Sequence, residues 1–255
     1  GLGLYSARVN GETLNWAPAP LWTPYGKRVL VDTYDVAPTL RNGENVLAVE
    51  LGNGWYNPLP LRMWGRFNLR EALAVGRPCF IAELDIEYAD GSRELVVTDA
   101  AWKAAEGPRL RNSLYLGEVY DARKEIEGWS EVGFDDAAWR PAVPAEGPSG
   151  RLVPRRAPPV EVRNSWSAAK VTEPKPGVYV ADMGGNFAGQ ACFQLGEGSA
   201  GERVTFRYGE LLNQDGTVNR LTGVCGQIKR AGMGGPGAPD VAEQCDVYFR
   251  RGGGH

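Results

Sequence analysis

The chain has 255 residues, of which 28 are basic and 31 acidic, and its formal net charge is −3. These charges are scattered, which argues against the basic patch of a nucleic-acid-binding protein or of a protein held on an anionic membrane. No run reaches the ~18 apolar residues of a membrane span, so neither nucleic acid nor membrane is an expected partner. The length suits one or two globular domains, and 34 Gly with 18 Pro favours turns over long helices.

The first half of the chain is typical of short strands joined by turns. Apolar residues that alternate with polar ones predict strands at Tyr5–Val9, Val29–Tyr34, Val46–Leu51, Cys79–Tyr88 and Arg93–Thr98. Tight turns are expected at Asn10-Gly11, Asn42-Gly43 and Asp90-Gly91, because Asn, Asp and Gly adopt positive φ most readily. This half therefore reads as one half-buried β domain.

A proline-rich stretch from 141 to 159 separates the two halves, and its composition suits neither a central strand nor a helix. We place a domain boundary there, giving domains 1–155 and 156–255. Further strands are predicted at Val178–Ala181, Gln190–Leu195, Arg203–Tyr208 and Asp246–Phe249. The expected fold class is all-β, with two β-sandwich domains of the jelly-roll or galactose-binding-like kind. Both chain ends read as strands, so we expect a segment of a longer protein, with the second sandwich continuing past residue 255 and the cellular compartment left open.

Histidine and cysteine content narrows the chemistry. His255 is the one histidine in the sequence, so neither a Ser-His-Asp nor a Cys-His catalytic set can form. The four cysteines show no C-x-x-C spacing, which argues against zinc and favours free, mostly buried thiols. Carboxylate pairs of a glycosidase cannot be recognised from spacing between strands. The residues by themselves therefore assign no catalytic role to any position.

The most informative polar region is Asp182-Met-Gly-Gly-Asn186-Phe-Ala-Gly, followed by Tyr208-Gly-Glu210. A glycine-rich turn and a strand that ends in a carboxylate are expected to bring Asp182, Asn186 and Glu210 around one small polar ligand, such as a sugar. The region is also rich in the oxygen atoms that Ca²⁺ takes, and Asp182, Asn186 and Asn219 are its candidate ligands. The alternative is that these side chains only brace local turns, as Asp and Asn commonly do.

Aromatic residues raise a second possibility. Sugars are bound by aromatic rings that stack on their C–H surfaces, and the chain has 8 Trp and 10 Tyr. Trp55 and Tyr56 follow Gly52-Asn-Gly54 and are expected at a strand end, where they are candidate carbohydrate-binding residues. The alternative is that they pack in the protein interior.

Several blocks in order resemble the N-terminal half of bacterial α-L-rhamnosidases, which are inverting glycoside hydrolases. They are Leu4-Tyr-Ser-Ala-Arg-Val-Asn-Gly11, Trp22-Thr-Pro-Tyr25 with Val31-Asp-Thr-Tyr-Asp-Val36, Asn42-Gly-Glu-Asn-Val46 leading to Leu51-Gly-Asn-Gly-Trp-Tyr56, and Asp182 to Gly189 with Ala200-Gly201 and Tyr208-Gly-Glu210. The resemblance spans nearly the whole chain. The chain departs from the family at Met183-Gly184-Gly185, where an aromatic and a glutamine are usual, and in the long glycine-rich stretch after Gly226.

The resemblance implies two β-sandwich domains, the second related to a rhamnose-binding module that can use calcium. It also implies that the catalytic carboxylates lie in an (α/α)₆ barrel that follows in sequence. The leading hypothesis is an accessory region of an α-L-rhamnosidase, whose partners are a glycan or glycoside containing L-rhamnose and the catalytic barrel of the same protein. The alternatives are a structural module without a ligand and a lectin-like carbohydrate-binding protein.

Overall fold

The structure is a computed structural model, and it describes residues 1–15, 21–58, 62–63, 67–223 and 243–253. Strands dominate this part of the chain, which confirms the all-β prediction. The short helical elements are α1 (Leu69–Ala72), η1 (Ala37–Thr39), η2 (Ala122–Lys124) and η3 (Arg220–Gly223). Among the described residues, no helix has the length and apolar character needed to cross a bilayer.

The chain divides into two compact units that are not contiguous in sequence. Unit 1 comprises Gly1–Pro58, Leu73–Glu106 and Ile126–Glu161, and unit 2 comprises Leu59–Ala72, Gly107–Glu125 and Val162–His255. A single cut near residue 155 does not describe this division, because residues 107–125 pack with the C-terminal part. The boundaries of the sequence domains, 1–155 and 156–255, stay a prediction.

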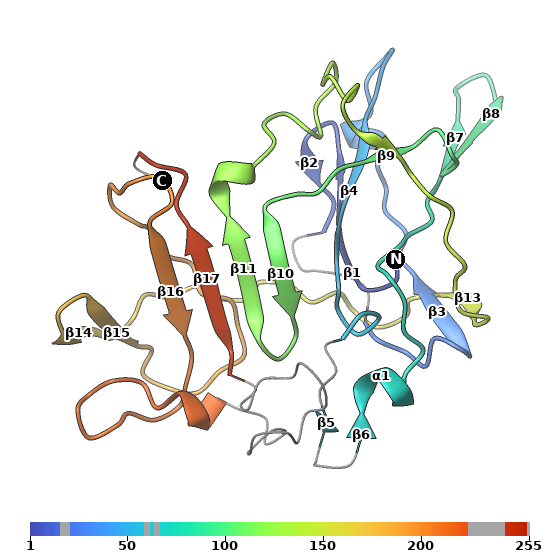
Figure 1. The fold of residues 1–255 in the computed structure, drawn as a ribbon. Coiled ribbons are helices and arrows are strands. Elements are labelled where there is room, and N and C mark those ends of the chain that lie inside the picture. The colour runs from blue at the N-terminus through green and yellow to red at the C-terminus, as the bar shows by residue number, and fades with distance from the viewer. Residues whose placement is uncertain (16–20, 59–61, 64–66, 224–242, 254–255) are drawn as a thin grey trace. The chain divides into compact units, whose positions relative to one another are not determined.

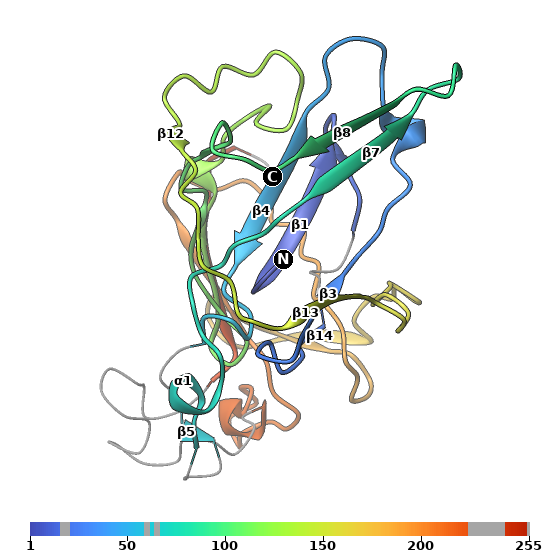
Figure 2. The ribbon, with the colours of Figure 1, turned by 90° about the vertical axis from the view of Figure 1, so that its right-hand side faces the viewer.

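Unit 1 is built on a small antiparallel sheet with the order β2-β1-β4, of which Figure 2 labels β1 and β4 side by side. Its strands are β1 (Leu4–Val9), β2 (Glu12–Thr13) and β4 (Leu47–Gly52). The turn predicted at Asn10-Gly11 joins β1 to β2, with φ of 50° at Asn10 and 84° at Gly11. Asn10 is buried, and its side-chain amide donates to the carbonyl of Thr39 and accepts from the backbone N–H of Val46, at 2.8 and 2.9 Å. One asparagine thus fixes both the turn and the strand opposite.

Two-stranded pairs complete unit 1. They are β3 (Arg28–Val31) with β13 (Arg151–Pro154), β7 (Glu83–Glu87) with β8 (Arg93–Val97), and β9 (Lys103–Ala104) with β12 (Arg140–Pro141). The core lies beside β3, where Leu2, Tyr25, Val29 and Tyr56 form a buried cluster. β13 pairs with β3 in parallel, so the residue that follows β13, Arg155, lies close to the residue that follows β3, Asp32. The two side chains form an ion pair at 2.6 Å.

Unit 2 is organised around a four-stranded sheet, in which the strand order is β10-β11-β17-β16 (Figure 1). The strands are β10 (Arg109–Ser113), β11 (Gly117–Asp121), β16 (Arg203–Arg207) and β17 (Cys245–Phe249). β11 and β17 run parallel although more than a hundred residues separate them, whereas the outer pairs are antiparallel. The sheet therefore joins a hairpin from the middle of the chain to its C-terminal part.

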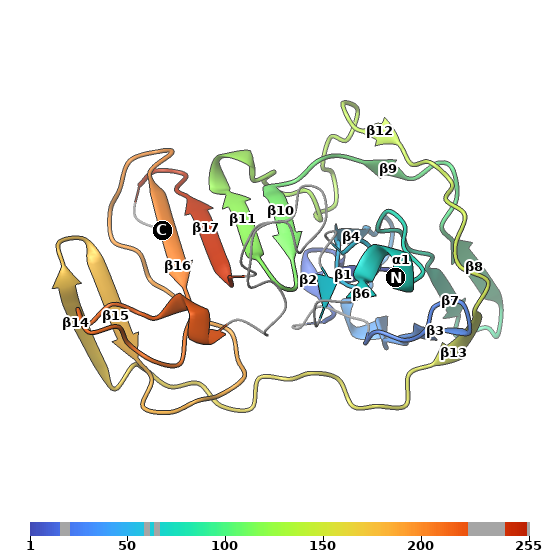
Figure 3. The same ribbon diagram turned by 60° about the horizontal axis from the view of Figure 1, so that its bottom comes forward.

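Smaller elements flank this sheet within unit 2. β14 (Lys170–Lys175) and β15 (Val178–Asp182) form a separate antiparallel hairpin, visible as a pair in Figure 3. β5 (Arg62–Met63) pairs with β6 (Phe67–Asn68) just before α1. Each of these pairs is two strands wide. The prediction of two β-sandwiches, the second of them incomplete within this chain, therefore stays a prediction.

Three strand predictions need correction. No strand forms at Gln190–Leu195. This segment instead contacts β16 through a side chain, since the ring of Phe193 stacks on that of Phe206 at a centroid distance of 4.2 Å. The strand predicted at Val29–Tyr34 ends at Val31, and the strand predicted from Cys79 begins at Glu83. In both cases the apolar pattern extends beyond the length over which a partner strand is available.

The cysteine prediction holds only in part. Cys79, Cys192 and Cys245 are free thiols, as expected. None of the three is buried: Cys192, in the segment that forms no strand, is exposed, and Cys79 and Cys245 are half-buried. Cys225 lies outside the described residues.

Candidate functional site

The polar motif that begins at Asp182 starts where β15 ends. Gly184 has a φ of 79°, and its backbone N–H donates to Oδ1 of Asp182 at 2.8 Å. This is the local bond by which an Asp side chain stabilises a turn. Further along, the side-chain amide of Asn186 donates to Oε1 of Glu210 at 3.0 Å. The structure thus brings together two of the three predicted ligand-binding residues, both of them exposed.

Glu210 and Asn219 are linked through Thr222. The backbone N–H of Glu210 donates to the hydroxyl of Thr222 at 2.8 Å, and that hydroxyl donates to the carbonyl of Asn219 at 2.7 Å. Oδ1 of Asn219 accepts from the backbone N–H of Leu221 at 3.2 Å, at the start of η3. Asn219 therefore caps a short helical turn, which is a common use of asparagine.

These contacts do not assemble a calcium shell. Ca²⁺ takes six to eight oxygen ligands in proteins. Asp182 and Asn219 each give an oxygen to a backbone N–H, and Asn186 turns its amide group toward Glu210. The described residues contain no group of three or more His, Cys, Asp or Glu side chains placed to hold a metal ion. Calcium binding at Asp182, Asn186 and Asn219 stays a prediction without support from this arrangement.

Asp215, in the same region, has the turn role expected of an Asp-Gly sequence. Its Oδ1 accepts from the backbone N–H and the hydroxyl of Thr217, at 3.1 and 2.6 Å. Its Oδ2 accepts from the ammonium group of Lys175 at 2.6 Å. The hydrogen bond from Lys175, followed by those from Thr217, holds the pKa of Asp215 well below its usual range. The carboxylate of Asp215 therefore stabilises its own turn and is paired with the charge of Lys175.

The aromatic pair Trp55 and Tyr56 divides between two roles. Tyr56 is 5% exposed and meets Tyr25 edge-to-face at a ring distance of 5.6 Å, so burial raises its pKa and its ring has no face for a sugar. The assignment of Tyr56 to carbohydrate binding is therefore corrected to a core role. Trp55 lies 5.6 Å from the ring of Trp22, which is 43% exposed. Trp55 keeps its assignment as a candidate carbohydrate-binding residue, with Trp22 beside it.

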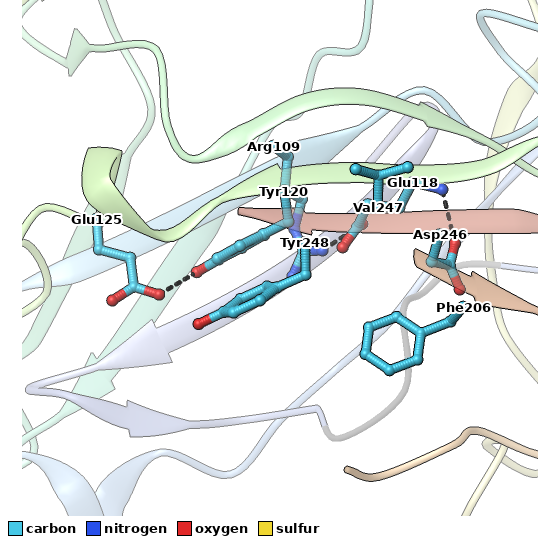
Figure 4. Close-up of a pocket in the computed structure, with 8 residues that line it drawn as sticks. All are labelled: Arg109, Glu118, Tyr120, Glu125, Phe206, Asp246, Val247 and Tyr248. Carbon is cyan, nitrogen blue, oxygen red and sulfur yellow. Dashed lines mark hydrogen bonds and ion pairs between the residues drawn. The ribbon is translucent and has the colours of Figure 1, made fainter. Parts of the chain in front are cut away.

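The described residues also form a hollow that the sequence did not reveal. It lies on one face of the unit 2 sheet, has a volume of about 390 Å³, and is lined by residues of β10, β11, β16 and β17 together with Glu125 (Figure 4). Tyr120 and Tyr248 dominate it, with nearly parallel rings whose centroids are 5.8 Å apart. The signal in the sequence was the repeated pattern Glu118-Val-Tyr120 and Asp246-Val-Tyr248, which occurs in the two central strands. This pattern matters only because β11 and β17 pair in parallel with Tyr120 opposite Tyr248.

A second hollow of about 200 Å³ lies next to Asp246 and Tyr208, and it is lined by Gly189, the last residue of the predicted motif, and by Gln190. Asp246 accepts from the hydroxyl of Tyr208 at 2.8 Å, and burial together with this bond raises the pKa of Tyr208. The end of the motif thus borders a polar recess. Neither Asn186 nor Glu210 lines this recess.

Comparison with protein families gives two matches in sequence order. Residues 1–164 match the model of the alpha-L-rhamnosidase N-terminal domain, and residues 172–231 match that of the bacterial alpha-L-rhamnosidase concanavalin-like domain. The expected relation of the second domain to a rhamnose-binding module stays a prediction. An alpha-L-rhamnosidase from Streptomyces avermitilis is 42% identical over 219 residues, which are 85% of this chain and 21% of that protein. One from Alteromonas is 33% identical over 217 residues, and the chain covers 23% of its length.

Solved structures give the same result. The alpha-L-rhamnosidase from Dictyoglumus thermophilum superposes over 99% of this chain and 25% of its own, with a TM-score of 0.83 and 35% identity. The Streptomyces avermitilis alpha-L-rhamnosidase complexed with L-rhamnose gives a TM-score of 0.79 and 36% identity, over 99% of this chain and 22% of its own. The chain therefore spans about a quarter or less of the relatives that it matches.

Proposed function

We propose a function on the premise that this chain belongs to the α-L-rhamnosidase family, which the match over residues 1–164 shows. It corresponds to the N-terminal region of those enzymes. The proposed role is that of an accessory region of a glycoside hydrolase that removes terminal α-L-rhamnose. The observation that carries the proposal is the ordered pair of family matches together with the superposition over 99% of the chain.

Catalysis is assigned to the part of such a protein that this chain does not include. Inverting glycosidases need two carboxylates about 6.5–9.5 Å apart across a substrate cleft, one of them acting as acid and the other as base. The carboxylates of the candidate site serve other purposes, since Asp215 pairs with Lys175 and Glu210 accepts from Asn186. The chain would bind carbohydrate, pack on the catalytic barrel, or do both.

The β14–β15 hairpin supports the packing role. Val171 pairs with Ala181 in the ladder, which places Val171, Tyr179 and Ala181 on one face, and Val171 and Tyr179 are 62% and 69% exposed. The opposite face carries Val180, which is buried. Exposed apolar side chains gathered on one face mark an interaction surface. We assign this face to contact with the remainder of a longer α-L-rhamnosidase chain.

The activity is tested by expressing the longer gene product and measuring hydrolysis of p-nitrophenyl-α-L-rhamnoside. We expect hydrolysis by that protein and none by the 255-residue chain, because no catalytic pair is assigned here. Hydrolysis by the short chain would contradict the assignment of catalysis elsewhere. An inert long product would contradict the proposed activity and favour the lectin-like or structural alternative.

The packing role is tested with Tyr179→Asp in both proteins. The variant is expected to lower the melting temperature of the longer product, because a charge would be buried at the contact. In the 255-residue chain the same variant should melt like the wild type, since Tyr179 is exposed there. Equal melting shifts in the two proteins would contradict the assigned contact.

A further inference from the structure

The hollow on the β10-β11-β17-β16 sheet has the size of a ligand site. Its volume of about 390 Å³ falls within the roughly 300–1,000 Å³ usual for small-molecule pockets. Because side chains alternate along a strand, the register Tyr120↔Tyr248 and Phe206↔Asp246 places these four side chains on one face of the sheet. The site is thus built on rigid strands rather than on loops.

Two tyrosines form the wall of the hollow. The rings of Tyr120 and Tyr248 are inclined by 13°, and the guanidinium of Arg109 lies 5.4 Å from the centroid of the Tyr120 ring. Figure 4 shows both hydroxyl groups at the same end, toward Glu125. Tyr120 is therefore held between Arg109 and Tyr248. A ring fixed in this way loses little conformational freedom when a ligand binds.

The two hydroxyl groups differ in their partners. The hydroxyl of Tyr120 donates to Oε1 of Glu125 at 2.8 Å. The hydroxyl of Tyr248 has no hydrogen-bond partner within the described part of the chain, and its residue is half-buried. A tyrosine hydroxyl both donates and accepts, and when partly buried it usually finds a partner. Tyr248 thus offers one donor and one acceptor to a ligand.

The charges of the hollow argue for an uncharged ligand. Arg109 forms an ion pair with Glu118, and Glu125 lies 3.7 Å from Arg251. Asp246 accepts from the backbone N–H of Glu118 at 2.7 Å and from the hydroxyl of Tyr208. Arg109 is the one cation among the residues that line the hollow, against three carboxylates. A phosphate or uronate would meet net repulsion here.

We propose that this hollow binds an uncharged sugar unit. The C–H face of the pyranose stacks on Tyr248 and reaches Phe206, while a ring hydroxyl exchanges hydrogen bonds with the hydroxyl of Tyr248. A 6-deoxy sugar such as L-rhamnose suits the site because its methyl group finds an apolar contact in Phe206. The choice of rhamnose rests on the proposed function, whereas the preference for a neutral sugar rests on the hollow itself.

The test is titration calorimetry of the 255-residue chain with L-rhamnose and with D-glucuronate. The wild type is expected to bind L-rhamnose in the millimolar range and to bind D-glucuronate more weakly. Tyr248→Ala should weaken rhamnose binding by about 3- to 10-fold, the size expected for loss of an aromatic contact. Tyr248→Phe, which keeps the ring, should weaken it by about 2- to 5-fold through loss of the hydroxyl hydrogen bond.

The matched control is Tyr88→Ala on the β7–β8 hairpin of unit 1. Tyr88 is also a partly exposed tyrosine at a strand end, and its hydroxyl donates to Glu94 at 2.6 Å. Its removal is expected to leave rhamnose affinity unchanged. Affinity lost equally in both alanine variants would overturn the proposal, because the loss would then not be local to the hollow.

Three further results would also overturn the proposal. They are a wild-type chain that releases no heat with L-rhamnose, a folded Tyr248→Ala variant with wild-type affinity, and tighter binding of D-glucuronate than of rhamnose. If Tyr248→Ala fails to fold, Tyr248→Phe decides, and unchanged affinity in that variant overturns the assignment. Hydrolysis of p-nitrophenyl-α-L-rhamnoside by the longer product reports separately on the proposed function.

Discussion

Units 1 and 2 differ in what they bury. In unit 1, Leu2, Tyr25, Val29 and Tyr56 join into one hydrophobic cluster, and strands from distant parts of the chain meet around it. Within the described residues of unit 2, no comparable cluster forms. Tyr179 is exposed there, and the Tyr120–Tyr248 pair is half-buried on one face of the sheet. The described part of unit 1 therefore has a buried apolar cluster that the described part of unit 2 lacks, although both units also expose large apolar side chains.

The largest expected effect contrasts one tyrosine from each unit. Tyr56→Ala should lower the free energy of unfolding by about 3–5 kcal/mol, because it leaves a cavity in the core of unit 1. Tyr179→Ala in unit 2 should change it by less than about 0.5 kcal/mol, because that ring is exposed. Urea denaturation of the 255-residue chain measures both values. Equal effects would mean that the two units do not differ in packing as the structure shows.

A smaller effect is expected from two ion pairs with the same length of 2.6 Å. In unit 1, Arg155 pairs with Asp32, whose side chain is 1% exposed, and in unit 2 Lys175 pairs with Asp215, whose side chain is 47% exposed. Arg155→Ala should cost about 3 kcal/mol, because it leaves a buried carboxylate without its cation. Lys175→Ala should give no measurable change, because water and salt screen an exposed pair.

Thermal unfolding in low and in moderate salt sharpens this comparison. The wild type and Arg155→Ala should keep their difference in melting temperature as salt is added, since a buried pair is screened little. If Arg155→Ala melts like the wild type, the buried pair contributes no more to stability than the exposed one, and the contrast between the units fails.

The smallest effect concerns Asp121 of unit 2, a buried carboxylate beside Arg123. The side-chain hydrogen bonds from Arg123 lower the pKa of Asp121. Its stabilising contribution is therefore present above the unfolded pKa of about 3.9 and is lost as the pH falls through the lowered folded value. Asp121→Asn should flatten the fall in melting temperature below about pH 4. A wild-type pH profile in that variant would show that the carboxylate charge is not what stabilises this end of β11.

Much of unit 1 could be predicted because its signals are local. Strands such as Val46–Leu51 and the Asn10-Gly11 turn follow from alternation and from residues that tolerate positive φ, and both appear in the structure. Contacts between residues far apart in the sequence could not be predicted. Tyr56 reads as an exposed aromatic at a strand end, yet its contact with Tyr25 makes it a core residue.

The candidate site shows the same limit. Asn186 and Glu210 were placed together correctly from the order of a glycine-rich turn and a strand, whereas Asp182 and Asn219 satisfy their own backbone turns. Short-range hydrogen bonds compete with ligand binding for the same oxygens. The outcome depends on the path of the backbone, which spacing does not give.

The sequence by itself determined the all-β class, the principal hairpin turns and the family, because these depend on residue type and order along the chain. The tertiary structure alone decided that residues 107–125 pack with the C-terminal part, and that Tyr120 lies beside Tyr248. The physical reason is that a parallel pairing between distant strands leaves no mark in either strand alone. The register of β11 with β17 places Tyr120 and Tyr248 side by side, and both then line the same hollow.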